Sequence, residues 1–393
     1  MKKYDFDTIT DRRSTYSVKW SGKKNELPMW VADMDFQTAP EIFEALQKRL
    51  NNGIFGYTYI PDEWYKAYQS WWGKRHNLKI DKDSLIFCTG VVPAISTAVR
   101  KLTTEAENVL IQPPVYNVFY NSIKNNGRNV IESPLLYSKG KYSINWKDLE
   151  EKLSDPQTTL MILCNPHNPV GKIWDKETLS KIGNLCLKYN VKVISDEIHC
   201  DITDPKRDYV PFASVSQTCA NISVTCLAPT KCFNIAGLHT AAVMVPNKDL
   251  RHKVWRALNT DEVAEPNAFA VEAAIAAFTK GADWLDSLRE YIKGSKNIIK
   301  AFIKKNIPDI YIVPSEATYL LWLDCSKITN DSEALAEFIW EKTGLFLSKG
   351  TIYGGNGNLF LRFNTACPRK LLEDGLSRLK RGIEFWKKSQ KLL

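Results

Sequence analysis

The sequence lacks the cysteine spacings of a disulfide scaffold or a zinc module. Its nine cysteines form no Cys-x-x-Cys pair and no regular framework, which is typical of reduced, buried thiols and favours a cytoplasmic protein. The start, Met1-Lys2-Lys3-Tyr4-Asp5, has no apolar run after its lysines, so we expect no signal peptide. No stretch is long and apolar enough to span a membrane, and we expect no membrane partner.

A basic stripe with interleaved aromatic residues is also missing. The net charge is +9, but the basic residues are spread along the chain and many fall in predicted exposed helices, such as the one near the C-terminus. No nucleic-acid-binding module is visible, so we expect no nucleic acid partner. The chain is 44% apolar, with a modest content of Gly and Pro, as in a compact globular protein.

Charge itself is scarce in one long segment. Between Tyr209 and Asn247 the only formally charged side chain is Lys231, although 25% of all residues are Asp, Glu, Lys or Arg. A buried segment whose one lysine reaches solvent would explain this pattern. Alternatively, an ammonium group in apolar surroundings has a lowered pKa and becomes the neutral amine that forms Schiff bases with carbonyl compounds. The second interpretation is favoured because the lysine follows a predicted strand, Ile222–Cys226, and a turn.

Short apolar runs alternate with helical patterns from residue 85 to residue 245, which predicts an α/β fold with a mostly parallel mixed sheet between helices. We place this large domain at residues 49–285. A smaller α+β domain is predicted at residues 286–393, with residues 1–48 packing against it and a helix over Ala282–Asn306 connecting the two bodies. The predicted strands of the large domain are Leu85–Cys88, Val109–Ile111, Leu160–Leu163, Val191–Ser195, Ile222–Cys226 and Ala241–Val245.

Polar residues follow several of these predicted strands. Asp196 ends one of them; it either caps a turn or, beside a Schiff-base lysine, keeps the nitrogen of a pyridine cofactor protonated. Another polar stretch, Cys164–Gly171, follows the predicted strand Leu160–Leu163 and has two Asn-Pro pairs. It is either an ordinary tight loop or a rigid turn that presents Asn168 to a ligand oxygen. Thr89–Pro93 joins a strand to a helix, where free backbone amides bind phosphate groups.

Asn168, Asp196 and Lys231 each belong to a short motif. The three motifs are Asn165–Gly171, Ser195–His199 and Ala228–Leu238. Further motifs are Asp5–Asp7, Asp11–Arg13, Pro28–Phe36, Phe55–Thr58, Gln112–Tyr116 and Ala366–Arg369. In this order and spacing they resemble fold-type I pyridoxal-phosphate enzymes of the class I/II aminotransferase superfamily. Within it, they resemble the MalY/PatB subgroup of cystathionine β-lyases and related carbon-sulfur lyases. The resemblance covers nearly the whole chain, and it is specific because the motifs occur together.

The resemblance implies a role for each of several residues at the cofactor ring. Lys231 would form the Schiff base with pyridoxal 5'-phosphate, and Asp196 would pair with the pyridine nitrogen. Asn168 and His199 would approach the hydroxyl oxygen of the ring, and Tyr116 would stack on the ring.

The cofactor phosphate has its own implied partners. The backbone of Gly90, Val91 and Val92 and the hydroxyl group of Thr230 would hold it. Tyr57 would reach it from a second subunit, so we expect a homodimer with shared active sites.

The resemblance also implies substrate contacts. Arg362 matches the arginine that binds the substrate α-carboxylate, although the residue pattern alone is equally typical of a surface arginine. Trp30 and Ala32 would lie beside the substrate. Many aminotransferases place an arginine on the cofactor phosphate eight residues after the lysine, whereas this chain has His239, as members of the lyase subgroup often lack that arginine. This departure leaves open which group neutralises the phosphate.

The predicted function is therefore α,β-elimination of cystathionine or a related cysteine S-conjugate to a thiol, pyruvate and ammonia. An aminotransferase of the same superfamily is the alternative, because both reactions use the same lysine, aspartate and arginine. A regulatory binding protein with residual lyase activity is a lesser alternative. Zinc binding is not expected, since the spacing of its candidate ligands matches no usual site; these are Cys164, His167, His199 and Cys200.

Overall fold

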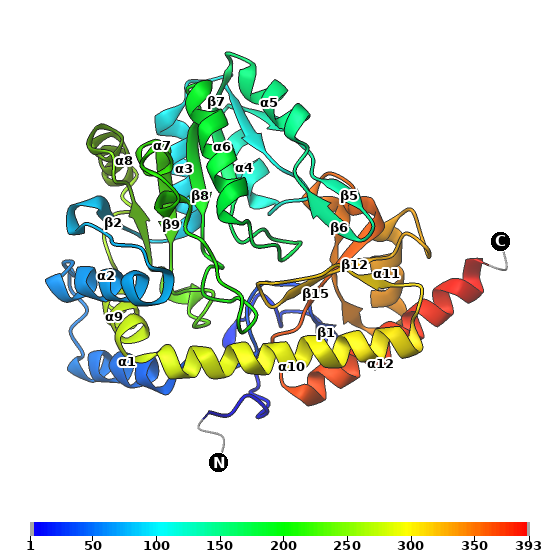
Figure 1. Ribbon diagram of the computed structural model, residues 1–393. Coiled ribbons are helices and arrows are strands. Elements are labelled where there is room, and N and C mark those ends of the chain that lie inside the picture. Colours follow the sequence, from blue (N-terminus) through cyan, green and yellow to red (C-terminus); the bar gives the residue numbers. More distant parts are fainter. Residues whose placement is uncertain (1–3, 391–393) are drawn as a thin grey trace.

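The computed structural model describes residues 4–390 and has a seven-stranded sheet at the centre of its larger body (Figure 1). Its spatial order is β2 (Leu85–Cys88), β10 (Ala241–Met244), β9 (Ser223–Leu227), β8 (Lys192–Asp196), β7 (Thr158–Cys164), β3 (Asn108–Ile111) and β4 (Asn129–Glu132). Strand β10 is antiparallel to both of its neighbours, and all other pairs are parallel. The predicted mixed, mostly parallel sheet is confirmed.

Helices cover both faces of this sheet. One face packs against α3 (Val91–Leu102), α4 (Val118–Lys124) and α8 (Lys248–Thr260), and the other against α5 (Trp146–Ser154), α6 (Lys176–Lys188) and α7 (Gln217–Ile222). Successive residues of β8 point to opposite faces of the sheet. Val193 packs in the core with α5, α6 and α7, and Ile194 packs in the core with α3, α4 and α8. Both faces of the strand are therefore buried, which agrees with the adjacent apolar pair Val193-Ile194 in its sequence.

A further helical layer completes the larger body. It consists of α1 (Pro40–Asn52), α2 (Asp62–His76) and α9 (Ala270–Lys280). Their shared core is rich in aromatic side chains, and Trp64, Tyr68 and Trp72 are fully buried there. Base rates for tryptophan predict this packing role.

The smaller body contains a four-stranded antiparallel sheet in the order β11 (Tyr311–Ile312), β12 (Leu320–Asp324), β15 (Phe360–Asn364) and β14 (Ser348–Lys349). Helices α11 (Ser332–Thr343) and α12 (Arg369–Gln390) pack beside it. The N-terminal segment joins this body, because β1 (Leu27–Pro28) pairs in parallel with β13 (Leu345–Phe346). A hairpin, β5 (Leu136–Ser138) and β6 (Lys141–Ser143), extends from the larger body.

Helix α10 (Ala282–Asn306) connects the two bodies, at the bounds predicted for it, and runs beneath both in Figure 1. Trp284 belongs to the core with α2 and α9, whereas Ile299 belongs to the core with β12 and β15. The segment before α1 is divided in the same way. Phe36 belongs to the core with α2 and α9, and Met29 belongs to the core with β12 and β15. The proposed boundaries after residues 48 and 285 stay predictions. Among the described residues, no helix is long and apolar enough to cross a membrane.

Candidate active site

A cavity of about 220 Å³ lies where β2, β7, β8 and β9 end. These four strands run in the same direction, so their C-terminal ends meet at one edge of the sheet, where ligands bind in open α/β folds. Most of the residues predicted for the site line this cavity: Ala32, Gly90, Val91, Val92, Tyr116, Asn168, Asp196, His199, Thr230 and Lys231. Arg362, Trp30 and Tyr57 lie outside this lining.

Lys231 is the only cationic side chain among the described residues that line the cavity. Its Nζ donates a hydrogen bond to the carbonyl oxygen of Ala32 at 2.6 Å. Burial lowers the pKa of Lys231 to about 8; the carboxylates of Asp33 and Asp196 oppose this shift, and Arg362 adds to it. A lysine with this pKa has a substantial neutral fraction near neutral pH and can act as a nucleophile or a base.

Asp196 faces the cavity from the end of β8. It is buried, and its Oδ1 accepts one hydrogen bond at 3.2 Å, from the backbone amide of Ile198. Burial raises the pKa of Asp196 to about 6. A buried carboxyl group with so few partners has the capacity to bind a cationic N–H group, such as a protonated ring nitrogen.

The neighbouring Glu197 has a different role. It accepts hydrogen bonds from the hydroxyl groups of Ser195 (2.8 Å) and Tyr209 and from the backbone amide of Phe212 (2.9 Å). Burial raises the pKa of Glu197 to about 8. Its oxygens are occupied within the protein, so of the two adjacent acids only Asp196 is available to a ligand.

Three uncharged groups line the cavity together with Asp196 and Lys231. His199 is buried, its Nδ1 has no hydrogen-bond partner, and burial lowers its pKa to about 3, so the ring is neutral. Burial raises the pKa of Tyr116 to about 12, so its hydroxyl group is also neutral. The side-chain oxygen of Asn168 accepts a hydrogen bond from Arg362. These groups suit a flat polar ring with a hydroxyl oxygen.

Arg362 reaches the same space from β15. Its Nη2 donates to the carbonyl oxygen of Trp30 at 2.7 Å, its Nη1 donates to Asn168 Oδ1 at 3.2 Å, and its guanidinium group lies 4.9 Å from the ring centroid of Tyr353. Its buried Nε has no partner, and no carboxylate of the described residues forms an ion pair with it. A buried arginine without a counterion is a site for a carboxylate ligand.

The other end of the cavity is formed by the start of α3. The helix begins at Val91, directly after Gly90, so the amides of Val91 and Val92 have no partner within the helix. Helix N-termini attract phosphate groups for this reason. Thr230 and His239 line the same cavity.

Two predicted residues lie apart from the cavity. Tyr57 is fully exposed (104%) and borders a separate hollow with Phe269, so it does not reach the cavity of its own chain. The ring of Trp30 packs 5.1 Å from that of Phe346 and lines another pocket with Trp340. Trp30 thus meets the site through its carbonyl group rather than its ring.

The residues considered for zinc do not form one group. Among the described residues, the metal-ligand types gather only at His76, Cys200 and Asp201. The carboxylate of Asp201 already accepts hydrogen bonds from the Trp71 indole at 3.0 and 3.1 Å. His167 lies elsewhere, with Nε2 2.8 Å from the carbonyl oxygen of Pro114.

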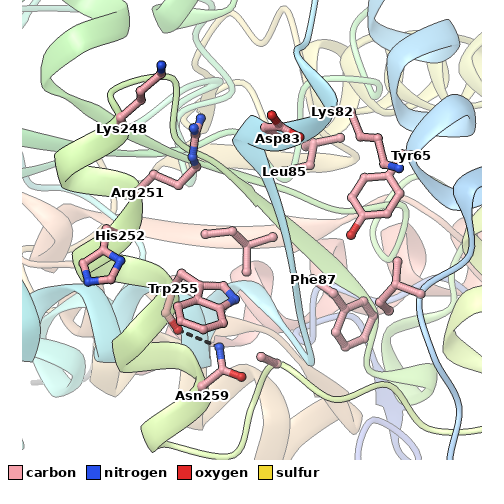
Figure 2. A pocket seen from close by; sticks show the side chains of 13 residues that line it. Tyr65, Lys82, Asp83, Leu85, Phe87, Lys248, Arg251, His252, Trp255 and Asn259 are labelled. Carbon is pink, nitrogen blue, oxygen red and sulfur yellow. Dashed lines mark hydrogen bonds between the residues drawn. The ribbon is translucent and has the colours of Figure 1, made fainter.

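A second pocket lies over the edge strand β2, beside α8 (Figure 2). Tyr65, Lys82, Arg251 and Trp255 are among its lining residues, and none of the predicted site residues is. Lys82 is engaged in an ion pair at 2.6 Å. The residues predicted from the sequence therefore gather at the cavity around Lys231 and not at this pocket.

Several contributors were missed in the sequence. The Tyr319 hydroxyl group donates to the Ala32 carbonyl oxygen at 2.9 Å, and the Ser348 hydroxyl group donates to that of Trp30 at 3.1 Å. Nothing in the sequence pattern marks these two residues. A signal did exist for Asn364, which lies two residues after Arg362 and hence on the same face of β15.

The arrangement matches the requirements of pyridoxal 5'-phosphate. The cavity offers an amine for the aldehyde, a buried carboxyl group for the ring nitrogen, neutral donors for the ring oxygen and a helix N-terminus for the phosphate. The unpartnered Nδ1 of His199 and Nε of Arg362 are buried polar atoms that a cofactor and an amino-acid substrate would satisfy.

Comparison with known proteins agrees with this arrangement. The family model "Aminotransferase class I and II" matches residues 25–379. The chain is 44% identical to cystathionine beta-lyase PatB of Bacillus subtilis, covering 96% of this chain and 100% of that protein. It is 33% identical to protein MalY of Escherichia coli, covering 96% and 98%.

A solved structure is similar over the same extent. Cystalysin from Treponema denticola, which contains a pyridoxal 5'-phosphate cofactor, superimposes with a TM-score of 0.94 at 34% identity, covering 97% of this chain and 99% of that one. The chain therefore belongs to the class I and II aminotransferase family and, within it, to the MalY/PatB-like group.

Proposed function

We propose that the protein is a pyridoxal-phosphate-dependent carbon-sulfur β-lyase that cleaves cystathionine or a related cysteine S-conjugate to a thiol, pyruvate and ammonia. The observation that carries the proposal is the placement of Lys231, the one cationic side chain that the described residues contribute to the cavity lining, together with Asp196 and next to Arg362. The names of the relatives support the substrate class, since PatB is a cystathionine beta-lyase. The proposal assigns these three residues to three tasks.

When bound, pyridoxal phosphate supplies a ring that delocalises negative charge developing at the Cα of an amino acid. Asp196 holds a proton at the ring nitrogen, which strengthens that delocalisation. Lys231 takes the proton from Cα, for which a pKa near 8 is suitable at neutral pH. Arg362 binds the α-carboxylate and so fixes which bond of Cα faces the lysine.

Elimination follows when the substrate has a thiolate leaving group at Cβ. The electron pair of the broken Cα–H bond forms the Cα–Cβ double bond, and the electron pair of the Cβ–S bond leaves with sulfur. Lys231, now protonated, is placed to return its proton to the departing thiolate. Water then hydrolyses the remaining enamine to pyruvate and ammonia, so apart from water the reaction needs no co-reactant, neither an oxidant nor a keto acid.

The proposed enzyme acts as a homodimer in which Tyr57 completes the site of the second subunit. Support comes from the full exposure of Tyr57 and from the exposed apolar side chains beside it, Ile54 (72%), Phe55 (52%) and Tyr59 (80%), which would be covered in a symmetric interface. Sedimentation that finds an active monomer would contradict this assembly. The nine buried free thiols support a reducing compartment, and we propose the cytoplasm.

The test of the proposed reaction uses the purified protein loaded with pyridoxal phosphate. We expect pyruvate and a thiol to appear from cystathionine without any keto acid. Amino-group transfer that depends entirely on an added keto acid, with no thiol release, would reject the lyase in favour of an aminotransferase. The matched control is Lys231→Ala, which should release neither product.

A further inference from the structure

One stretch of backbone, residues 30–36, passes between the two bodies and holds both basic groups of the site. We call it the bridging segment. The carbonyl oxygen of Ala32 accepts from Lys231 Nζ at 2.6 Å, and that of Trp30 accepts from Arg362 Nη2 at 2.7 Å. The lysine belongs to the larger body and the arginine to β15 of the smaller one. The position of this backbone therefore affects where both groups stand.

Asn234 fixes the bridging segment from the side of the larger body. It lies three residues after Lys231, and its side-chain amide donates to the carbonyl oxygens of Met34 (3.0 Å) and Phe36 (2.7 Å). Its side-chain oxygen accepts from the backbone amide of Met34 at 2.9 Å. Three hydrogen bonds thus tie the segment to the loop that carries the lysine.

Asn364 fixes the same segment from the side of the smaller body. It lies two residues after Arg362 and is buried, and its side-chain amide donates to the carbonyl oxygens of Val31 (2.6 Å) and Asp33 (2.7 Å). Its side-chain oxygen accepts from the backbone amide of Ala366 at 2.8 Å, which fixes the orientation of the amide. Asn364 thus ties the segment to the strand that carries the arginine.

We propose that Asn234 and Asn364 are positioning residues, each of which places its neighbouring basic group through the bridging segment. The roles of Lys231 and Arg362 in this inference rest on the proposed function. Only a side-chain amide offers two donors and an acceptor in one plane. An aspartate at either position would keep the acceptor but lose both donors.

The two asparagines should have different effects when they are removed. Asn234 acts on the side of Lys231, so its loss should alter the binding and the titration of the cofactor. Asn364 acts on the side of Arg362, so its loss should alter the binding of the amino-acid carboxylate. A purely structural role would instead lower stability and leave both properties as they are.

The first experiment compares Asn364→Ala with the unaltered enzyme, both loaded with pyridoxal phosphate. We expect KM for cystathionine to rise about tenfold, with kcat within about threefold, because a carboxylate contact made equally in ground and transition states is weakened. Binding of L-alanine, followed by the absorbance of the cofactor, should weaken by about the same factor. L-alanine has no leaving group at Cβ, so this measurement does not depend on lyase activity.

The second experiment uses Asn234→Gly, because Asn234 has φ of 57°, which glycine adopts without strain. We expect the pH midpoint of the visible absorbance band to shift by about one unit and the cofactor to bind about tenfold more weakly. KM should stay within about threefold. The charged groups that face Lys231 are Asp33, Asp196 and Arg362; the substitution leaves all three in the chain, so a shift would report a changed distance between the lysine and these groups.

The matched control is Thr38→Val. The Thr38 hydroxyl group donates to the carbonyl oxygen of Phe233 at 2.8 Å, so it ties the same two stretches of chain together just beyond the bridging segment. The control should leave KM and the pH midpoint unchanged. The inference is overturned if the asparagine variants behave like this control, or if each changes KM and the pH midpoint equally. Absence of pyruvate release from the unaltered enzyme would reject the proposed lyase, while the L-alanine and pH measurements would still decide the role of the asparagines.

Discussion

Lys231 and Lys296 are two buried lysines with similar acidity and different surroundings. Burial lowers the pKa of each to about 8. Lys296 lies in α10 with its side chain fully buried (0% exposed), and its Nζ contacts Asp204 Oδ1 at 2.8 Å, Ser315 Oγ at 3.1 Å and the carbonyl oxygen of Ala317 at 3.4 Å. Lys231 faces a cavity and has one carbonyl partner.

The difference teaches that a lowered pKa alone does not identify a functional lysine. Both shifts arise mainly from burial, but the fully buried Lys296 has its hydrogen bonds satisfied by the protein. Lys231 has donors to spare and adjoins a cavity with a second titratable group, Asp196. Perturbed acidity marks a site when it coincides with unused bonding capacity in a cavity.

The largest expected effect separates the two lysines by activity. Lys231→Ala should lower kcat for pyruvate release by about 10³-fold or more, because it removes both the Schiff-base amine and the base. Lys296→Met should keep kcat within about threefold at a temperature where it is folded. Equal losses in the two variants would show that the comparison is wrong. If Lys231→Ala kept a biological effect of the protein, that effect would belong to a regulatory role.

The next largest effect is a difference in how substitution of Lys296 and of Lys231 changes the stability of the protein. Lys296→Met should lower the free energy of unfolding by about 2 to 3 kcal/mol, since Asp204 loses one partner of a buried pair and keeps Lys293 at 2.5 Å. Urea unfolding followed by tryptophan fluorescence measures this change. A second substitution, Asp204→Leu, should recover part of the loss, because the unpaired buried carboxylate is then removed. An unchanged unfolding midpoint in Lys296→Met would contradict the structural role.

Lys231→Met should change the free energy of unfolding in the opposite direction in the cofactor-free protein, so that this variant is more stable. The folded pKa of Lys231, about 8, lies below the ordinary 10.5, so its charged form costs folding free energy below pH 8. That cost disappears as the pH rises from about 8 to about 10.5. We expect the variant to be more stable by about 1 kcal/mol at pH 7, a value reduced for the partial exposure of the side chain, and no more stable near pH 11. Urea unfolding at both pH values tests the sign.

The smallest effect concerns Asp33, a carboxylate near Lys231 that does not contact it. Asp33 raises the pKa of Lys231 by attraction without contacting its Nζ, while Arg12 pairs with Asp33 at 2.7 Å. Asp33→Asn should lower the pKa of Lys231 further, by about half a unit. The pH dependence of Schiff-base formation between the cofactor-free protein and pyridoxal phosphate reports this pKa. A rise would mean that Asp33 does not act on the lysine through its charge.

Much of the fold was predictable because the central strands are buried on both faces. Strand β7 contains the apolar run Leu160–Cys164, β8 and β9 are short, mostly buried strands with few charged residues, and α10 has a regular helical pattern over its full length. Strand β4 was missed because it is an edge strand with an exposed or half-buried sequence. The two-residue strands β1 and β13 were missed because only their pairing with each other defines them.

The candidate site also has a part that was predictable from the sequence and a part that was not. Most of the predicted residues that line the cavity belong to short motifs at strand ends, so their presence there was predictable from the sequence. The bridging segment was only partly predictable, because Asn234 and Met34 are 200 residues apart and Asn364 and Val31 are 333 residues apart. Such contacts exist only after the two bodies come together. The packing of the Trp30 ring against Phe346 was not predictable for the same reason, and the predicted place of Trp30 beside the substrate stays a prediction.

Helix α10 has a consequence for how the molecule melts. One continuous helix supplies Trp284 to the core of the larger body and Ile299 and Ile303 to the core of the smaller one. Because a helix propagates its order cooperatively along its length, loss of packing at one end destabilises the other. Calorimetry should therefore record one heat-absorption peak for both bodies, and a protease cut at the start of α10 should leave neither fragment with a complete core.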